Sequence, residues 1–311
     1  MPDKIKTVEL NSGEYVAIKA KEIIAVPMLS VIENSFPQNT DVEKEYRQGF
    51  GNLLSEVFQN YSNIKYSNNT AEIAVEMIWL TEAVQNQSYK AKIRLFMVLR
   101  AVAQDKNSAL NYVNRLETAC TSVLHLYKYE AESIAHDDMD QLIGNIPDQS
   151  VYAVVKDERE ERFQNAIIPA CFGFDVFDAY ANHLDSIINS LIDYPNCVIS
   201  IQIIPTHLTE EENAMVTQIS QALGMLSKGI MEQGVGNISF SETETLANTY
   251  KHYVTNRNSA LFMYNIVVMG DDLSTENIAS KMLGYINSDT SKQTAVKKIR
   301  LNKDKYLETL I

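Results

Sequence analysis

The polar residues best placed for chemistry lie where a predicted strand runs into a predicted helix. Thr209 follows the strand-like segment 198–205, and Ser274 follows the segment 261–269. Free backbone N–H groups at a helix N-terminus, together with a hydroxyl side chain, attract anions such as phosphate. Thr209 and Ser274 are therefore candidate anion-binding residues, although the same positions are also typical of ordinary helix caps.

Three further groups could take part in catalysis or metal binding. His207 could act as a general base, Cys171 as a reactive thiol, and the acidic run 136–140, with His136 at its start, as the seed of a metal site. Each also has a simpler interpretation: a surface histidine, a buried thiol and an acidic loop. No cation stands beside Cys171 in the sequence, and no second ligand cluster lies near the acidic run. We therefore predict no catalytic residue, no metal site and no cofactor.

The sequence lacks the loop that binds nucleotide in ATP-driven motors. That loop needs the pattern G-x-x-x-x-G-K-[ST], in which backbone amides and a lysine surround the phosphates. The nearest match, residues 224–229, reads GMLSKG, so its lysine precedes the second glycine, and it lies within a predicted helix. We do not expect the chain itself to hydrolyse ATP.

Composition limits the class of protein further. The chain has 311 residues, of which 45% are hydrophobic and 22% charged, as in a globular protein with a full core. The net charge of −13 disfavours direct binding of nucleic acid and of anionic membranes. No apolar run reaches the ~20 residues of a membrane helix, and the first residues lack the apolar core of a signal peptide. The three cysteines form no CxxC pair, so reduced thiols and a cytoplasmic location are expected.

Hydrophobic periodicity predicts strands and helices along the first half. Segments 71–79 and 89–99 alternate strictly, which favours a long hairpin with one apolar face and one charged outer face carrying Glu76 and Arg94. Opposite charges on the two arms would then pair across the strands. The other predicted elements are a hairpin at 7–19, a helix at 41–60, a polar boundary at 61–70, a helix at 106–125 and a short strand at 126–129.

The second half alternates strands and helices. Its best helix starts near Thr209, with Glu212 completing a capping box and Met215, Ile219 and Leu223 on the inward stripe. The whole pattern predicts an α/β (α+β) fold of layered, ferredoxin-like split β-α-β units, preceded by a small β-hairpin and helix. The expected regions are 1–67, 68–147 and 148–311. The other elements predicted here are strands at 152–155, 261–269 and 296–301, and helices at 177–191 and 242–253 and from 274 or 275.

The order of these strand patterns resembles the N-terminal region of bacterial ATP-binding proteins of the HerA–FtsK class, including those tied to conjugation and phage defence. The segments that carry the resemblance are 76–79, 86–92, 200–206 with 210–212 after it, and 261–265 before Gly270. Such proteins have an α/β front region followed by a ring-forming, DNA-translocating motor. The motor's nucleotide-binding motif is absent here, so the resemblance implies the front region alone and carries no ATP hydrolysis to any residue.

We therefore expect a non-enzymatic assembly or partner-recognition module that binds protein partners, either further copies of itself or an ATPase motor chain. Two alternatives stay open. One is a structural component of a phage-like or secretion assembly, which an acidic chain without motifs would suit equally well. The other is an enzyme of unfamiliar type, with its site at the strand-to-helix turns 205–209 and 270–275.

Overall fold

A computed structural model provides the structure of the chain. The segments that it describes are residues 5–25, 42–66, 71–84, 91–135, 138, 150–156, 159–162, 170–173, 191–228, 240–256, 261–286 and 296–301. The fold is mixed α and β, as predicted, and is built on a nine-stranded sheet in which every strand pairing is antiparallel.

The first part of the sheet has the strand order of a split β-α-β unit. From its edge inward the order is β5-β2-β4-β3, and β1 pairs with β2 on the same side as β5. In chain order these four strands are the fourth, first, third and second of the unit, which is the ferredoxin-like arrangement that the sequence predicts. The elements are β1 (Lys6–Glu9), β2 (Tyr15–Ala25), α2 (Val42–Tyr66), β3 (Glu72–Ala83), β4 (Ala91–Ala103), α3 (Lys106–Leu126) and β5 (Glu130–Ile134).

The second part of the sheet repeats that order. From the opposite edge inward it runs β11-β6-β10-β9, again the fourth, first, third and second strands of its unit. The predicted helix at 177–191 lies outside the described residues except for Leu191. The elements are β6 (Ser150–Lys156), β9 (Val198–Thr206), α6 (Glu210–Ser227), α7 (Phe240–Asn256), β10 (Leu261–Gly270), α8 (Asp272–Ile286) and β11 (Val296–Leu301), with a separate pair, β7 (Arg159–Arg162) and β8 (Ala170–Gly173).

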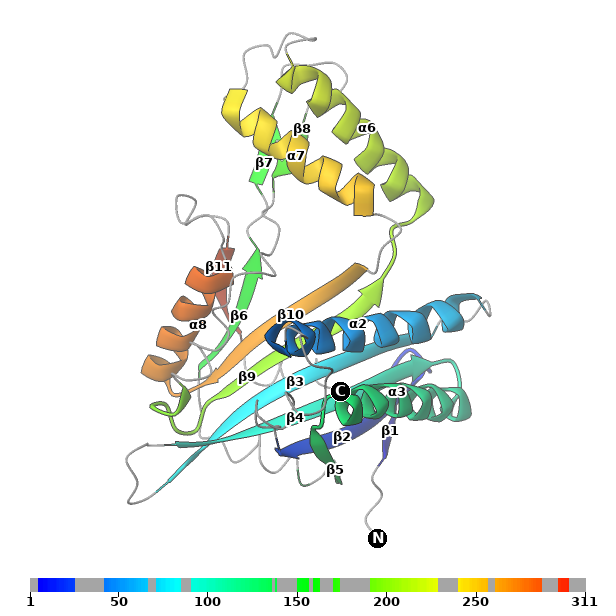
Figure 1. Cartoon of the computed structure of the whole chain (residues 1–311), viewed down its shortest axis with the longest axis vertical. Coiled ribbons are helices and arrows are strands. Elements are labelled where there is room, and N and C mark those ends of the chain that lie inside the picture. Colours follow the sequence, from blue (N-terminus) through cyan, green and yellow to red (C-terminus); the bar gives the residue numbers. More distant parts are fainter. Residues whose placement is uncertain are drawn as a thin grey trace.

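The two units join edge to edge through β3 and β9. These strands pair from Leu80 with Val198 to Val75 with Ile203. β3 and β9 are each the second strand of their unit, and they pair in antiparallel orientation. The two strand orders are therefore related by a pseudo-twofold axis that passes between β3 and β9. Strands from all three expected regions, 1–67, 68–147 and 148–311, belong to this one sheet (Figure 1).

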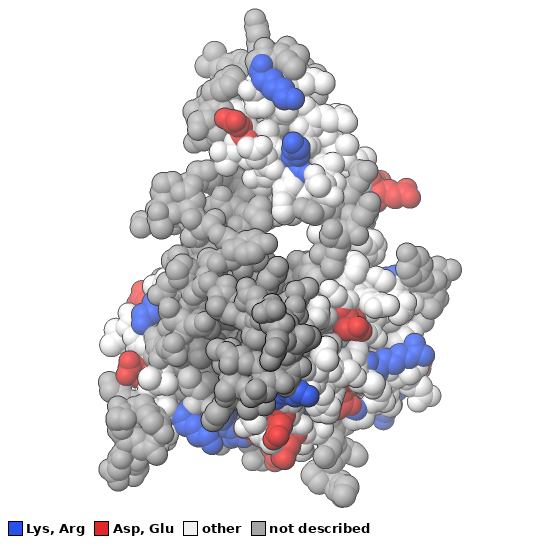
Figure 2. All heavy atoms as spheres, viewed as in Figure 1, with Lys and Arg blue, Asp and Glu red and all other residues white. Residues whose placement is uncertain are grey.

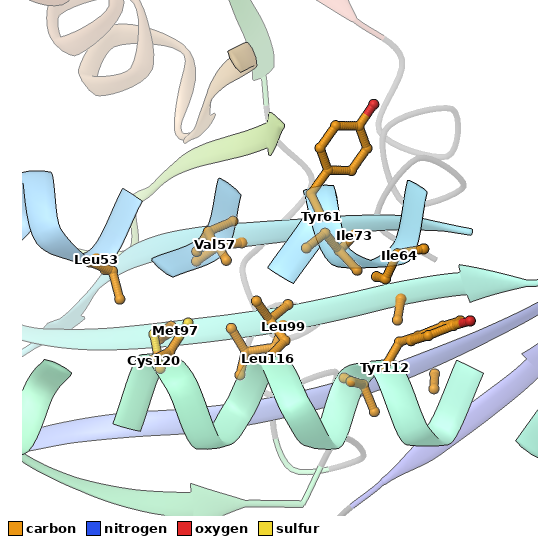
Figure 3. Packing of buried hydrophobic residues seen from close by; sticks show 14 of the residues in the cluster. Leu53, Val57, Tyr61, Ile64, Ile73, Met97, Leu99, Tyr112, Leu116 and Cys120 are labelled. Carbon is orange, nitrogen blue, oxygen red and sulfur yellow. The ribbon is translucent and has the colours of Figure 1, made fainter. Parts of the chain in front are cut away.

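One face of the sheet is covered by α2, α3 and α8. Apolar side chains of α2 and α3 pack on the odd-numbered residues 97–103 of β4, and Figure 3 shows Met97 and Leu99 beside Val57 and Leu116. On the second unit, α8 packs Ile278 and Met282 over the same face. Trp79 of β3 lies in that second cluster, so a strand of the first unit contributes to the core of the second.

The opposite face is also buried, which corrects the prediction of a solvated, charged outer face. Ile18, Ile78, Leu80, Phe96 and Val98 lie on it and are all at most 3% exposed. Two charged residues of this face, Glu76 and Arg100, are buried with them. Strict alternation of apolar and charged residues therefore does not mark a water-facing side here, because the two buried charges bond to each other.

Two element boundaries differ from the prediction. The polar stretch 61–70 was expected to separate regions, but α2 continues through Tyr66 with Tyr61 and Ile64 in the core. The segment 126–129, expected to be a strand, is instead the last residue of α3 and the turn that follows it. Tyr129 donates its N–H to the Leu124 carbonyl at 2.9 Å, and Lys128 has a φ of 62°, the left-handed conformation that commonly ends a helix. The strand follows at β5.

Between β9 and β10 the chain forms a helical hairpin, α6–α7, that projects from the end of the two paired strands (Figure 1). Its two helices pack on each other through their own small core, Ala222, Leu223 and Leu226 against Leu246, Ala247 and Tyr250. Met215, which the sequence places on the inward stripe, is instead 60% exposed.

Gly224 weakens α6 without any structural need for a glycine. It lies inside the helix, and a Cβ added there would meet no atom within 4 Å. Replacing an interior helical glycine by alanine removes backbone freedom from the unfolded chain. We expect Gly224→Ala to raise the free energy of unfolding of the hairpin by about 0.5–1 kcal/mol. Amide hydrogen exchange of α6 measures this; unchanged or faster exchange would contradict the open space at the site.

Candidate functional site

Thr209 is the N-cap of α6, in the capping box that the sequence predicts. Its hydroxyl accepts from the N–H of Glu212 at 3.2 Å, and the Glu212 carboxylate accepts from the N–H of Thr209 at 2.7 Å. The bond from the Thr209 backbone lowers the pKa of Glu212. The N–H groups of Thr209 and Glu212, which a phosphate could otherwise use, already have acceptors, and three adjacent glutamates add negative charge. Capping explains the position fully, so an anion site at Thr209 stays a prediction without support.

Ser274 lies in the first turn of α8, which starts at Asp272, earlier than the predicted start at 274 or 275. The cap is provided by Asp271, whose carboxylate accepts from the Ser274 N–H at 3.0 Å. Partial burial would raise the pKa of Asp271, but hydrogen bonds from Ser274 and the first-turn amides outweigh it and hold the pKa below its usual value. A carboxylate therefore occupies the place that an anion would take.

The two strand-to-helix turns do not form one site. Thr206 pairs with Leu261 at one end of the β9–β10 ladder, and Val198 pairs with Met269 at the other. At ~3.4 Å per residue these ends are roughly 27 Å apart. The enzyme hypothesis placed its site at the turns 205–209 and 270–275, so the structure separates the residues that it would have to bring together.

His207 lies where the chain leaves β9 for the helical hairpin, and it is exposed. Its Nδ1 is 2.6 Å from the hydroxyl of Tyr61, on α2. The Tyr61 ring also contacts Phe58, which in turn meets Phe262 edge-on at the start of β10. The histidine thus belongs to an aromatic contact that holds the base of the hairpin against α2, and this contact accounts for it without a role in catalysis.

Cys120 and Cys197 are buried, as the sequence predicts, and burial is the main reason that the pKa of each thiol rises to about 12. At neutral pH both are protonated and poor nucleophiles. The Cys171 side chain lies outside what the structure describes. Of the run 136–140 only Asp138 is described, and the described residues contain no group of three or more potential metal ligands.

The burial of these thiols leads to a test of the packing. In a Cys171→Ser chain we expect neither Cys120 nor Cys197 to react with a thiol reagent at neutral pH until the protein unfolds. Reaction should then follow the unfolding transition as denaturant is added. Mass spectrometry of the alkylated chain measures it; rapid labelling of either residue in the native state would contradict the packing.

The arrangement closest to a reactive constellation was missed in the sequence. Arg100 on β4 and Ser200 on β9 both donate to the carboxylate of Glu76 on β3, and all three side chains are buried. One signal could have found it. Glu76 and Arg100 lie at even-numbered positions of β3 and β4, on the same side of the strands as the apolar residues Ile78 and Phe96. Since both Glu76 oxygens accept hydrogen bonds inside the core, the cluster ties the two units together and presents no group to a substrate.

A second charged cluster lies between β2 and α3. Glu117 of α3 bonds to Lys19 and, at 3.0 Å, to Lys21. Arg94 similarly joins Glu22 and Glu82, at 2.7 and 2.9 Å, on the other face. Each of these groups therefore links neighbouring elements.

The remaining candidate is a surface, the outward side of the helical hairpin. Residues 213–227 of α6 contain no charged side chain, although a water-facing helix usually carries several. Met215 and Met225 are 60% and 45% exposed there. Figure 2 shows the hairpin at the top of the molecule, where blue and red side chains are set among uncharged white atoms. Flexible, polarisable methionines on an exposed helix are typical of protein-binding surfaces.

No protein-family model matches the chain, and no curated protein matches it significantly in sequence. Within the described segments, no helix combines the length and the apolar character needed to cross a membrane. The strand orders and the hairpin between β9 and β10 define the fold class: two split β-α-β units in one sheet, with an inserted helical hairpin.

Proposed function

We propose that the chain is a non-enzymatic assembly and partner-recognition module, and that the α6–α7 hairpin is its recognition element. The observation that carries the proposal is the hairpin itself: it projects from the sheet, has its own core and bears exposed methionines within the uncharged stretch 213–227 of α6. The candidate polar groups that the structure describes support the same view, since each caps a helix or joins two elements.

The partner class follows from the resemblance to the front region of HerA–FtsK-class proteins. We propose that the module acts in the cytoplasm as the front region of, or an accessory to, a ring-forming DNA-translocating ATPase. Segments 76–79, 200–206 and 261–265, which carry that resemblance, lie in the adjacent strands β3, β9 and β10. With a net charge of −13, the module would leave contact with DNA to the motor.

Affinity capture with the full chain as bait, in lysate of its native cell, tests the proposal. We expect a captured protein that carries G-x-x-x-x-G-K-[ST], and no ATP hydrolysis by the chain alone. Assembly of the chain into a closed ring or polymer without an ATPase would favour the structural-component alternative. Absence of both partner binding and self-association at micromolar concentration would overturn the recognition role.

A further inference from the structure

The exposed side of α6 carries a regular stripe of residues. Its members recur at alternating intervals of three and four, which is the contact pattern of coiled-coil helices. All six are exposed, so the stripe has no partner within the described part of the chain. They are Glu211, Ala214, Gln218, Gln221, Met225 and Lys228, called here the outer stripe.

The outer stripe of one chain can match the outer stripe of a second copy when the two helices run in opposite directions. Its positions are symmetric about the midpoint between Gln218 and Gln221, so an antiparallel second copy would superpose each position on another member of the same set. The large Met225 would then face the small side chain of the partner's Ala214. Gln218 would face the partner's Gln221, and a carboxamide both donates and accepts hydrogen bonds.

The charges at the ends favour the same arrangement. Antiparallel pairing places Glu211 opposite the partner's Lys228, twice in the symmetric pair. A parallel pair would set glutamate against glutamate and lysine against lysine, and it would align the two helix dipoles unfavourably. The symmetric arrangement is also the commonest for homo-oligomers, in which one patch contacts itself.

We infer that the outer stripe of α6 binds a second copy of this chain in an antiparallel, twofold-symmetric helix pair. This inference rests on the proposed recognition role of the hairpin and names its partner. One helix face buries less than the ~1,600 Å² of a standard interface, so the dimer should be weak, of about micromolar affinity.

Sedimentation equilibrium of the full chain over micromolar concentrations tests the inference. We expect a monomer–dimer equilibrium that Met225→Glu weakens at least about tenfold, because a charge replaces the apolar contact with the small side chain opposite, which occurs twice in the symmetric pair. Lys228→Glu should weaken it as well, because it sets like charges opposite each other. The double variant Glu211→Lys with Lys228→Glu should restore the dimer, since it only exchanges the two ends of the pair.

The matched control is Lys251→Glu, the same charge change at an exposed position of α7 outside the outer stripe. It should leave dimerisation unchanged, and circular dichroism should show that all variants keep their helices. A chain that stays monomeric, or a dimer indifferent to both Met225→Glu and the charge exchange, would overturn the inference. If a monomeric chain still binds an ATPase through the hairpin, the proposed function stands and only the second copy as partner is excluded.

Discussion

Replacing Arg100 by methionine should lower the free energy of unfolding by about 3–5 kcal/mol, because it leaves the carboxylate of Glu76 buried without its counter-charge. Glu76 is 1% exposed, so water cannot take the place of the lost guanidinium. Denaturant unfolding followed by circular dichroism measures the change.

Arg94 offers a matched control on the same strand and the same face. Its partners Glu22 and Glu82 are partly solvent-exposed, so Arg94→Met should cost only about 1 kcal/mol or less. The double variant Glu76→Leu with Arg100→Met should recover much of the loss, since a buried ion pair can often be replaced by apolar side chains. Equal costs for Arg100→Met and Arg94→Met would show that the Glu76 site is open to water.

Replacing Trp79 by alanine should cost about 3–5 kcal/mol, the usual loss for a large buried aromatic side chain. Trp79 belongs to a strand of the first unit but packs in the core beside Ile278 and Met282 of the second. The loss should therefore destabilise both units together. Calorimetry of the variant should show one transition at a lower temperature, and Trp79→Phe should cost less.

Since Trp79 is the only tryptophan of the chain, its fluorescence gives a second measurement in the unmodified protein. If the units unfold as one body, the fluorescence transition should coincide with that followed by circular dichroism. Two separate transitions, one of them unaffected by Trp79→Ala, would mean that the joined sheet does not act as one cooperative unit.

Much of the fold could be predicted from local patterns. Alternation in segments 71–79 and 89–99 specified the β3–β4 hairpin, and helical spacing specified α3, because both signals arise within a few residues. The capping box at Thr209 was equally local. These elements in order were enough for the split β-α-β arrangement.

What the sequence did not reveal depends on distant pairings. Nothing in β3 alone shows that it pairs with β9, more than a hundred residues later, and without that pairing Ser200 has no visible relation to Glu76. The prediction of a solvated, charged face on the β3–β4 strand hairpin was wrong for the same reason. Whether Glu76 faces water or a buried arginine is decided by neighbouring strands and by what covers the sheet.

The candidate site, too, could be predicted from the sequence only in part. The helix caps at Thr209 and Asp271 explain why hydroxyl and acidic residues gather at the strand-to-helix turns, and only the structure shows that these turns lie at opposite ends of one strand pair. The outer stripe was hidden because its inward neighbours, such as Leu223, gave the stronger hydrophobic signal.

The most direct test of the recognition role is removal of the helical hairpin. Thr206 and Leu261 are paired neighbours across β9 and β10, so an Asn-Gly turn can join them in place of residues 207–260. The shortened chain should keep its sheet, because the hairpin core is separate from those of the sheet. We predict that it folds but captures no partner that the full chain captures; a folded, shortened chain that still binds those partners would contradict the account.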